Sequence, residues 1–162
     1  MLEMKVDGLT LDPLTNTPII TLKDHSGKKV LPIWVGIFEA NAIALQMEKV
    51  VTPRPMTHDL IKNIFVGIEA KVNHIIVNDL KDNTFYATIS LTLNNNIVNI
   101  DSRPSDAIAV ALRVNAPIYV AEKVIDMARG IEPLESNEMG DSEKWKKWLQ
   151  DLKPDDFGKS EM

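Results

Sequence analysis

The chain has 162 residues, of which 44% are hydrophobic and 25% charged, an ordinary balance for one soluble globular domain. It lacks cysteine, which excludes disulfides, thiolate metal sites and cysteine nucleophiles, and three histidines make a multi-histidine zinc site improbable. The net charge of −5 argues against a broad phosphate-binding surface. With no apolar run of spanning length and no secretory leader, the sequence predicts a cytoplasmic protein without a membrane partner.

The first fifty residues read as three strands followed by a helix. Strands are expected over residues 4–11, 18–22 and 30–35, and Pro32 indicates an edge strand or a bulge in the third. A helix is expected over residues 38–49, with small and aliphatic side chains recurring on one face. Glu39 would lie in its first turn, where a carboxylate complements the helix dipole.

A second helix follows a segment interrupted by Pro53 and Pro55. Thr57 is a good N-cap residue for it, and Gly67 suits its C-terminal end. The pattern predicts that its apolar side chains face the core; these are Leu60, Ile61, Ile64 and Phe65.

The next strands lead into a charged turn and a third helix. Strands are expected over residues 71–80 and 84–93, and a further strand ends near residue 100. Pro104 suits the first helical position, which makes Arg103 the N-cap and puts Asp106 in the first turn. The following residues, AIAVALRV, are almost entirely apolar, so this helix should be internal. A short strand over residues 118–120 comes after it.

The two halves of the chain share the order strand, strand, strand, helix. A shift of 65 residues lays Ala42-Ile43-Ala44 on Ala107-Ile108-Ala109, which suggests an internal β-β-β-α duplication. The expected fold class is therefore α+β, with an antiparallel or mixed sheet and two or three core helices.

The chain divides by pattern into a domain over residues 1–135 and a C-terminal helix and tail over residues 136–162. Trp145, Trp148, Leu149 and Leu152 fall on one face of an amphipathic helix, which predicts that this helix packs on the domain. The alternative is that tryptophans and lysines form a surface on which nucleic-acid bases stack.

Two charged turns carry the side chains that could take part in catalysis or ligand binding. One is Arg54-Pro55-Met56-Thr57-His58-Asp59, and the other is Asp101-Ser102-Arg103-Pro104-Ser105-Asp106. Both contain Arg-Pro followed by a hydroxyl residue and an aspartate, and both open a helix. Helix N-termini attract anions, arginine binds phosphate, aspartate suits Mg²⁺ or Mn²⁺, and histidine can act as a general base. The candidate catalytic residues are His58, Asp59, Asp101 and Asp106; the candidate substrate-binding residues are Arg54, Thr57, Arg103 and Ser105; the candidate metal ligands are Asp59, Asp101 and Asp106. The structural alternative is that the aspartates complement helix dipoles while the arginines pair with nearby acids.

Several segments, in order, resemble the bifunctional nuclease family: PIWVGIFEANAIA, TPRPMTHDL, FYATISL, IDSRPSDAIAVALR and PIYVAEKV. The resemblance covers residues 1–123, and the tail WKKWLQDLKPDDF is also similar to members of the family. It implies a compact α+β domain with DNase and RNase activity, and the eight candidate residues fall in the family's motifs. The chain departs from the family in having Glu48-Lys49-Val50-Val51 where a glycine-containing turn is expected, and it lacks the extra C-terminal module of some plant relatives.

Chemistry and resemblance together predict a nuclease that hydrolyses phosphodiester bonds of DNA or RNA with the help of Mg²⁺ or Mn²⁺. Nucleic acid would be the substrate, and a homo-oligomer is expected. The alternative is a non-catalytic module that binds an anionic ligand or a protein through the same Arg-Pro turns. If the turns form one site, they should face one cleft.

Overall fold

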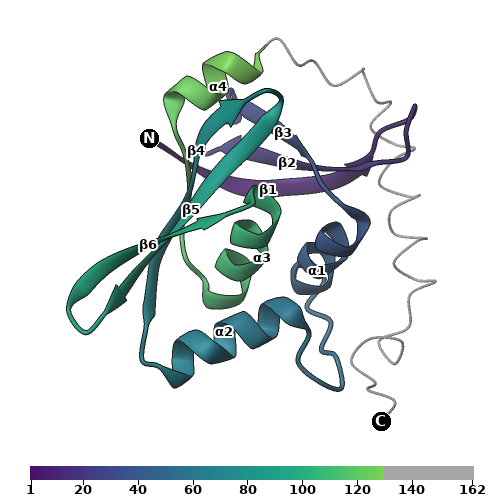
Figure 1. Ribbon diagram of the computed structural model, residues 1–162. Helices are drawn as coiled ribbons and strands as arrows, with labels where there is room; N and C mark the ends of the chain where they lie inside the picture. Colours follow the sequence, from purple (N-terminus) through teal and green to yellow (C-terminus); the bar gives the residue numbers. More distant parts are fainter. Residues whose placement is uncertain (130–162) are drawn as a thin grey trace.

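The computed structural model describes residues 1–129, in which seven strands form a single mixed sheet (Figure 1). The strands are β1 (Leu2–Leu11), β2 (Pro18–Asp24), β3 (Val30–Trp34), β4 (Lys71–Lys81), β5 (Thr84–Leu93), β6 (Asn96–Ser102) and β7 (Ile118–Val120). The helices are α1 (Ile37–Met47), α2 (Thr57–Gly67), α3 (Pro104–Val114) and α4 (Glu122–Ala128). Helices α1, α2 and α3 lie together, and α4 lies on the far side of the strands from α2 (Figure 1).

The strand order is symmetrical about β7. It runs β3-β2-β1-β7-β4-β5-β6, so an antiparallel three-stranded meander lies on each side of the central strand. Strand β7 is antiparallel to β1 and parallel to β4. Each meander is followed by a helix, and these two helices, α1 and α3, pack against each other. This arrangement confirms the α+β class and repeats the β-β-β-α order that the sequence suggested.

Helix α3 is the internal helix that its composition predicts. Arg103 is the N-cap with extended backbone angles, and Pro104 is the first helical residue. Residues 107–110 are completely buried, and Asn115 ends the helix in the left-handed conformation. The charged turn before α3 is therefore attached to the most rigidly packed helix of the domain.

Helix α2 is much less buried than its apolar pattern predicts. The side chains of Leu60 and Ile64 are 53% and 49% exposed, and His58 is the one fully buried residue of this helix. Thr57 is the first helical residue rather than the N-cap, which is Met56, because the Asp59 carboxylate accepts the Met56 N–H at 3.0 Å. The expected inward position is wrong for Leu60 and Ile64, because only one side of α2 packs on α3. Of the other two predicted side chains, Phe65 packs against the core and Ile61 is half-buried.

Strands β3 and β6 form the two edges of the sheet. Strand β3 is an edge strand and contains Pro32, as the sequence predicts.

Among residues 1–129, no helix is long and apolar enough to cross a membrane. The domain boundary expected at residue 135 and the tryptophan helix expected after it lie outside the described residues.

The buried centre of α3 should dominate the stability of the domain. Replacing the fully buried Ile108 by alanine (Ile108→Ala) is expected to lower the free energy of unfolding by about 2–5 kcal/mol, because it leaves a cavity between helix and sheet. The matched control is Ile97→Ala on β6, where the side chain is exposed and the change should stay within about 0.5 kcal/mol. Urea unfolding followed by circular dichroism measures both, and similar losses would contradict this account of the core.

Candidate functional site

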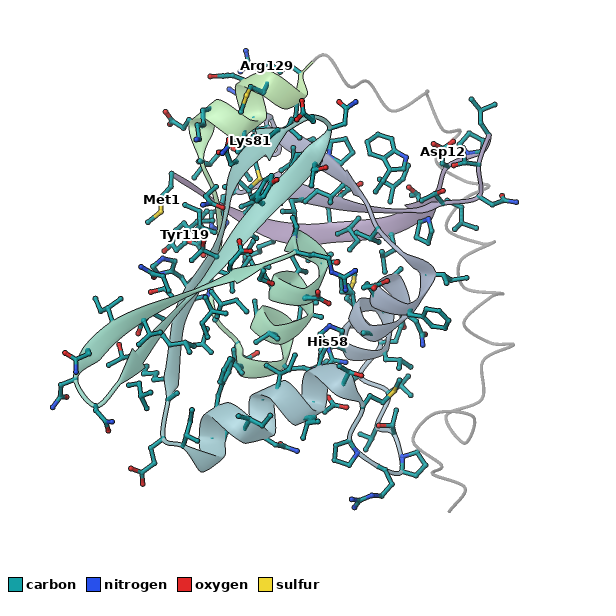
Figure 2. The ribbon with its side chains drawn as sticks, in the orientation of Figure 1. Met1, Asp12, His58, Lys81, Tyr119 and Arg129 are labelled. Carbon is teal, nitrogen blue, oxygen red and sulfur yellow. The ribbon has the colours of Figure 1, made fainter. Side chains whose placement is uncertain are left out.

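The first turns of α2 and α3 meet through a histidine and an aspartate that are 48 residues apart in the chain. Nε2 of His58 lies 2.8 Å from Oδ1 of Asp106. His58 is only 7% exposed, and Figure 2 shows it where α2 approaches the bundle of α1 and α3. One residue from each Arg-Pro turn thus contributes to the same contact.

Arg103 extends this contact to α1. Its Nε donates to the second carboxylate oxygen of Asp106 at 2.8 Å, and its Nη2 lies 2.9 Å from Oε1 of Glu39. Glu39 lies in the first turn of α1, close to Gly36, where a Cβ atom would collide with the glutamate carboxylate. The side chain of Arg103 nevertheless remains 64% exposed. It therefore joins two acidic side chains while still facing solvent.

The surroundings of Asp106 keep its carboxylate ionised. Burial raises the pKa of Asp106, but hydrogen bonds from Arg103 and His58 outweigh this effect, and the pKa lies below its usual value. An ionised carboxylate accepts hydrogen bonds only, so Nε2 of His58 carries the proton of the shared hydrogen bond. Within residues 1–129, no protein group hydrogen-bonds to the other ring nitrogen, Nδ1. That nitrogen is available to accept a proton.

A groove of about 750 Å³ begins at this cluster and runs between α2 and the outer strands. Its floor is mainly apolar and is formed by Ile61, Ile64, Phe65, Phe85, Ile89, Ile100 and Val110. His58, Asp101, Arg103 and Asp106 line its charged end, together with Thr57. We call this cavity the apolar groove. Ser105 is buried under the start of α3 and is not among the lining residues.

Arg113 is a buried charged residue that the sequence analysis did not single out. Its Nε donates to Oδ1 of Asp59 at 2.7 Å, its Nη1 to the carbonyl of Ala109 at 2.9 Å, and its Nη2 to the carbonyl of Ala42 at 3.0 Å. It is 7% exposed. The signal was present in the sequence, since an arginine inside an otherwise apolar buried helix needs a partner. Asp59 and Ala42 could not be identified as its partners because they lie on other helices.

Asp59 is committed to this second ion pair. Burial raises the pKa of Asp59, but the hydrogen bonds from the Met56 N–H and from Arg113, with the positive charge of Arg113, lower it further, so the carboxylate ionises below its usual pH. Asp59 borders a different cavity, of about 310 Å³, which also receives Arg54, Lys62 and Arg113. We call it the loop cavity. The predicted site residues therefore divide between two cavities on either side of the α2 N-terminus.

Side chains that could hold a metal ion are mostly engaged in ion pairs. Among residues 1–129 there is no group of three or more histidine and acidic side chains placed to hold a metal ion. Asp59 is paired with Arg113, and Asp106 with Arg103 and His58. Asp101 is the predicted ligand that has no ion-pair partner in this part of the chain. Metal binding by these three aspartates remains a prediction.

Comparison with known proteins identifies the class to which this fold and its charged turns belong. The family model of the bifunctional nuclease domain matches residues 20–132, which include both Arg-Pro turns. The chain belongs to the bifunctional nuclease domain family. Two similar relatives are the uncharacterized proteins MT1877 and Rv1829 of Mycobacterium tuberculosis, strains CDC 1551 and H37Rv. Each is 38% identical over 162 residues, covering 96% of this chain and 97% of the relative.

Removing the guanidinium of Arg113 should destabilise the whole domain. Arg113→Ala leaves the Asp59 carboxylate partly buried without its cation and is expected to cost about 3–5 kcal/mol in the free energy of unfolding. The control is Arg129→Ala, because Arg129 forms an exposed pair with Asp126 at 3.6 Å whose loss should cost about 1 kcal/mol or less. Denaturant unfolding compares the two variants. If the Arg113 variant were as stable as its control, the ion pair would not hold α2 in place.

The ionisation of Asp59 should also make stability depend on pH. An aspartate in the unfolded chain has a pKa of about 3.9, and the folded value is lower. The unfolded state therefore binds a proton first as the pH falls. Stability should be complete at neutral pH and should decrease from about pH 5 downward through the folded pKa. Asp59→Asn should start from a lower stability at pH 7 and decline less steeply in acid, as measured by urea unfolding at several pH values. An equally steep decline would contradict the assignment.

Proposed function

We propose that this protein is a nuclease that hydrolyses phosphodiester bonds of DNA or RNA. The observation that carries the proposal is the His58–Asp106 hydrogen bond at the charged end of the apolar groove. Membership of the bifunctional nuclease domain family supports the same reaction class.

His58 acts as the general base in the proposed reaction. Asp106 fixes the imidazole so that Nε2 is protonated and Nδ1 is free to take a proton. Nδ1 removes a proton from a water molecule as the water oxygen forms a bond to phosphorus. The P–O bond to the leaving sugar oxygen breaks with its electron pair on that oxygen, which takes a proton from solvent water. The buried position of His58 keeps the ring in one orientation during this step.

Arg103 and Thr57 are the proposed substrate contacts at the groove. Arg103 keeps part of its guanidinium exposed after pairing with Asp106 and Glu39, and this part can donate to a phosphate oxygen. Thr57 lines the same end of the groove and offers a hydroxyl group. The side chain of Ser105, being buried, would support the turn rather than touch nucleic acid.

A requirement for Mg²⁺ or Mn²⁺ is the remaining part of the proposal. In the described structure the ion pairs of Asp59 and Asp106 do not leave a three-carboxylate site open, and no step above depends on a metal. Asp101 is the side chain best placed to take part, because it lines the groove without an ion-pair partner in residues 1–129.

Cleavage of fluorescently labelled DNA and RNA oligonucleotides by the purified protein tests the proposal. His58→Ala should reduce the cleavage rate by about 10²–10⁴-fold, because it removes the general base. The matched control is His25→Ala, which changes an exposed histidine in the loop between β2 and β3 and should cleave at the wild-type rate. Repeating the assay with a chelator, and then with added Mg²⁺ or Mn²⁺, tests the metal requirement separately.

The alternative function is a non-catalytic module that uses the same turns. It would be favoured if the wild-type protein bound nucleic acid without cutting it under any metal condition. Equal cleavage by wild type and His58→Ala would instead trace the activity to other residues or to a contaminant. Either result would overturn the proposed role of His58.

A further inference from the structure

The loop cavity is a polar site that the proposed chemistry does not use. It lies between the segment 50–55, which connects α1 to α2, and the first two turns of α2. Its lining residues are Leu45, Gln46, Val50, Val51, Thr52, Pro53, Arg54, Pro55, Asp59, Lys62, Asn63 and Arg113. Whereas apolar side chains dominate the apolar groove, most of this wall consists of polar and charged groups and backbone.

Charge separates the two cavities clearly. At the charged end of the apolar groove, Arg103 pairs with Asp106 and with Glu39, and Asp101 is a further acidic lining residue. The acidic side chains in that cluster outnumber the single arginine. Around the loop cavity the basic side chains outnumber the acidic ones, with Arg54, Lys62 and Arg113 against Asp59. An anion should therefore be attracted to the loop cavity more strongly than to the apolar groove.

The positive charge of the loop cavity is not neutralised from within. Arg113 and Asp59 cancel each other in their ion pair. Arg54 and Lys62 have no ion-pair partner among residues 1–129, so their two charges are uncompensated. Since Arg54 is exposed and Lys62 half-buried, both can turn toward a ligand without first breaking a contact.

The backbone of the same segment offers further donors. The N–H groups of Val51, Thr52 and Arg54 donate to no acceptor within residues 1–129. Thr52 and its neighbouring prolines restrict the segment, since the Thr52 hydroxyl donates to the carbonyl of Arg54 at 2.8 Å and each proline fixes one backbone angle. Free N–H groups beside two cations are suited to the oxygens of a phosphate.

Two adjacent residues of α2 line the two cavities, so a single extended ligand could reach both. His58 lines the apolar groove, and Asp59, the next residue, lines the loop cavity, so the two cavities border different sides of the same helix start. We propose that the loop cavity binds a backbone phosphate of the nucleic-acid strand whose neighbouring phosphodiester is presented to His58. The identity of the ligand as a strand rests on the proposed nuclease function; the anion site itself rests on the charges and donors above.

Binding without cleavage tests this subsite. Fluorescence anisotropy of a labelled single-stranded oligonucleotide, measured in chelator over a range of salt concentrations, compares wild type with the double variant Arg54→Ala/Lys62→Ala. We expect at least about tenfold weaker binding and a salt dependence shallower by about one unit of log–log slope. The matched control is Lys28→Ala/Arg129→Ala, which removes the same two charges from exposed positions outside both cavities and should bind like wild type.

The outcomes separate this proposal from the nuclease proposal. Wild-type affinity in the Arg54→Ala/Lys62→Ala variant, equal weakening in the control, or no binding by the wild type at low salt would each overturn the subsite. Urea unfolding of both double variants checks that weaker binding does not reflect loss of the fold. If the cavity variant lost binding but the wild type never cut nucleic acid, the subsite would stand and the nuclease function would fall. Inorganic phosphate alone, tested as a competitor of the oligonucleotide, shows whether the site takes a free anion as well.

Discussion

The buried guanidinium of Arg113 is the contact on which the arrangement of the three helices depends. It belongs to α3, donates to a carbonyl of α1 and pairs with Asp59 of α2. A charge in this position is costly unless it is paired and hydrogen-bonded, and here each of the three guanidinium nitrogens donates to an acceptor. Helix α2 buries little apolar surface, so its position relies on this ion pair and on the His58–Asp106 hydrogen bond. The geometry of both cavities therefore depends on two polar contacts as well as on the packing of one side of α2 on α3.

Each of these helices has an acidic residue at its third position: Glu39 in α1, Asp59 in α2 and Asp106 in α3. Such residues stabilise a helix start through the macrodipole, and arginines pair with all three. These acidic residues therefore have the structural role that the sequence offered as an alternative, in which they complement helix dipoles and pair with arginines. It does not compete with a catalytic role, because the contacts that hold Asp106 also keep it ionised and orient His58.

The sequence predicted those features that local chemistry determines. Pro104 and the apolar run after it specified the start and the burial of α3, and Pro32 indicated an edge strand. Features that depend on contacts between residues far apart in the chain could not be predicted from the sequence. Strand β7 has three residues and lies between β1 and β4, an insertion that no local pattern reveals. Two of the three partners of Arg113, Asp59 and Ala42, are 54 and 71 residues away in the chain. Neither the division of the predicted site into two cavities nor the ion pair of Asp59 with Arg113 could therefore be deduced from the sequence.

The position of α2 explains why the candidate chemistry lies on one side of a nearly symmetrical domain. The two β-β-β-α units place α1 and α3 against each other, and the strand order is symmetrical about β7. After α1 the chain forms α2, whereas after α3 it forms β7, so α2 has no counterpart. His58 and Asp59 are both in its first turn, and both cavities border it. A duplicated scaffold would present equivalent surfaces from its two halves. Helix α2, inserted between the halves, makes these surfaces different. A polar, cationic cavity therefore lies on one side of the α2 N-terminus, and an apolar groove with an acidic end lies on the other.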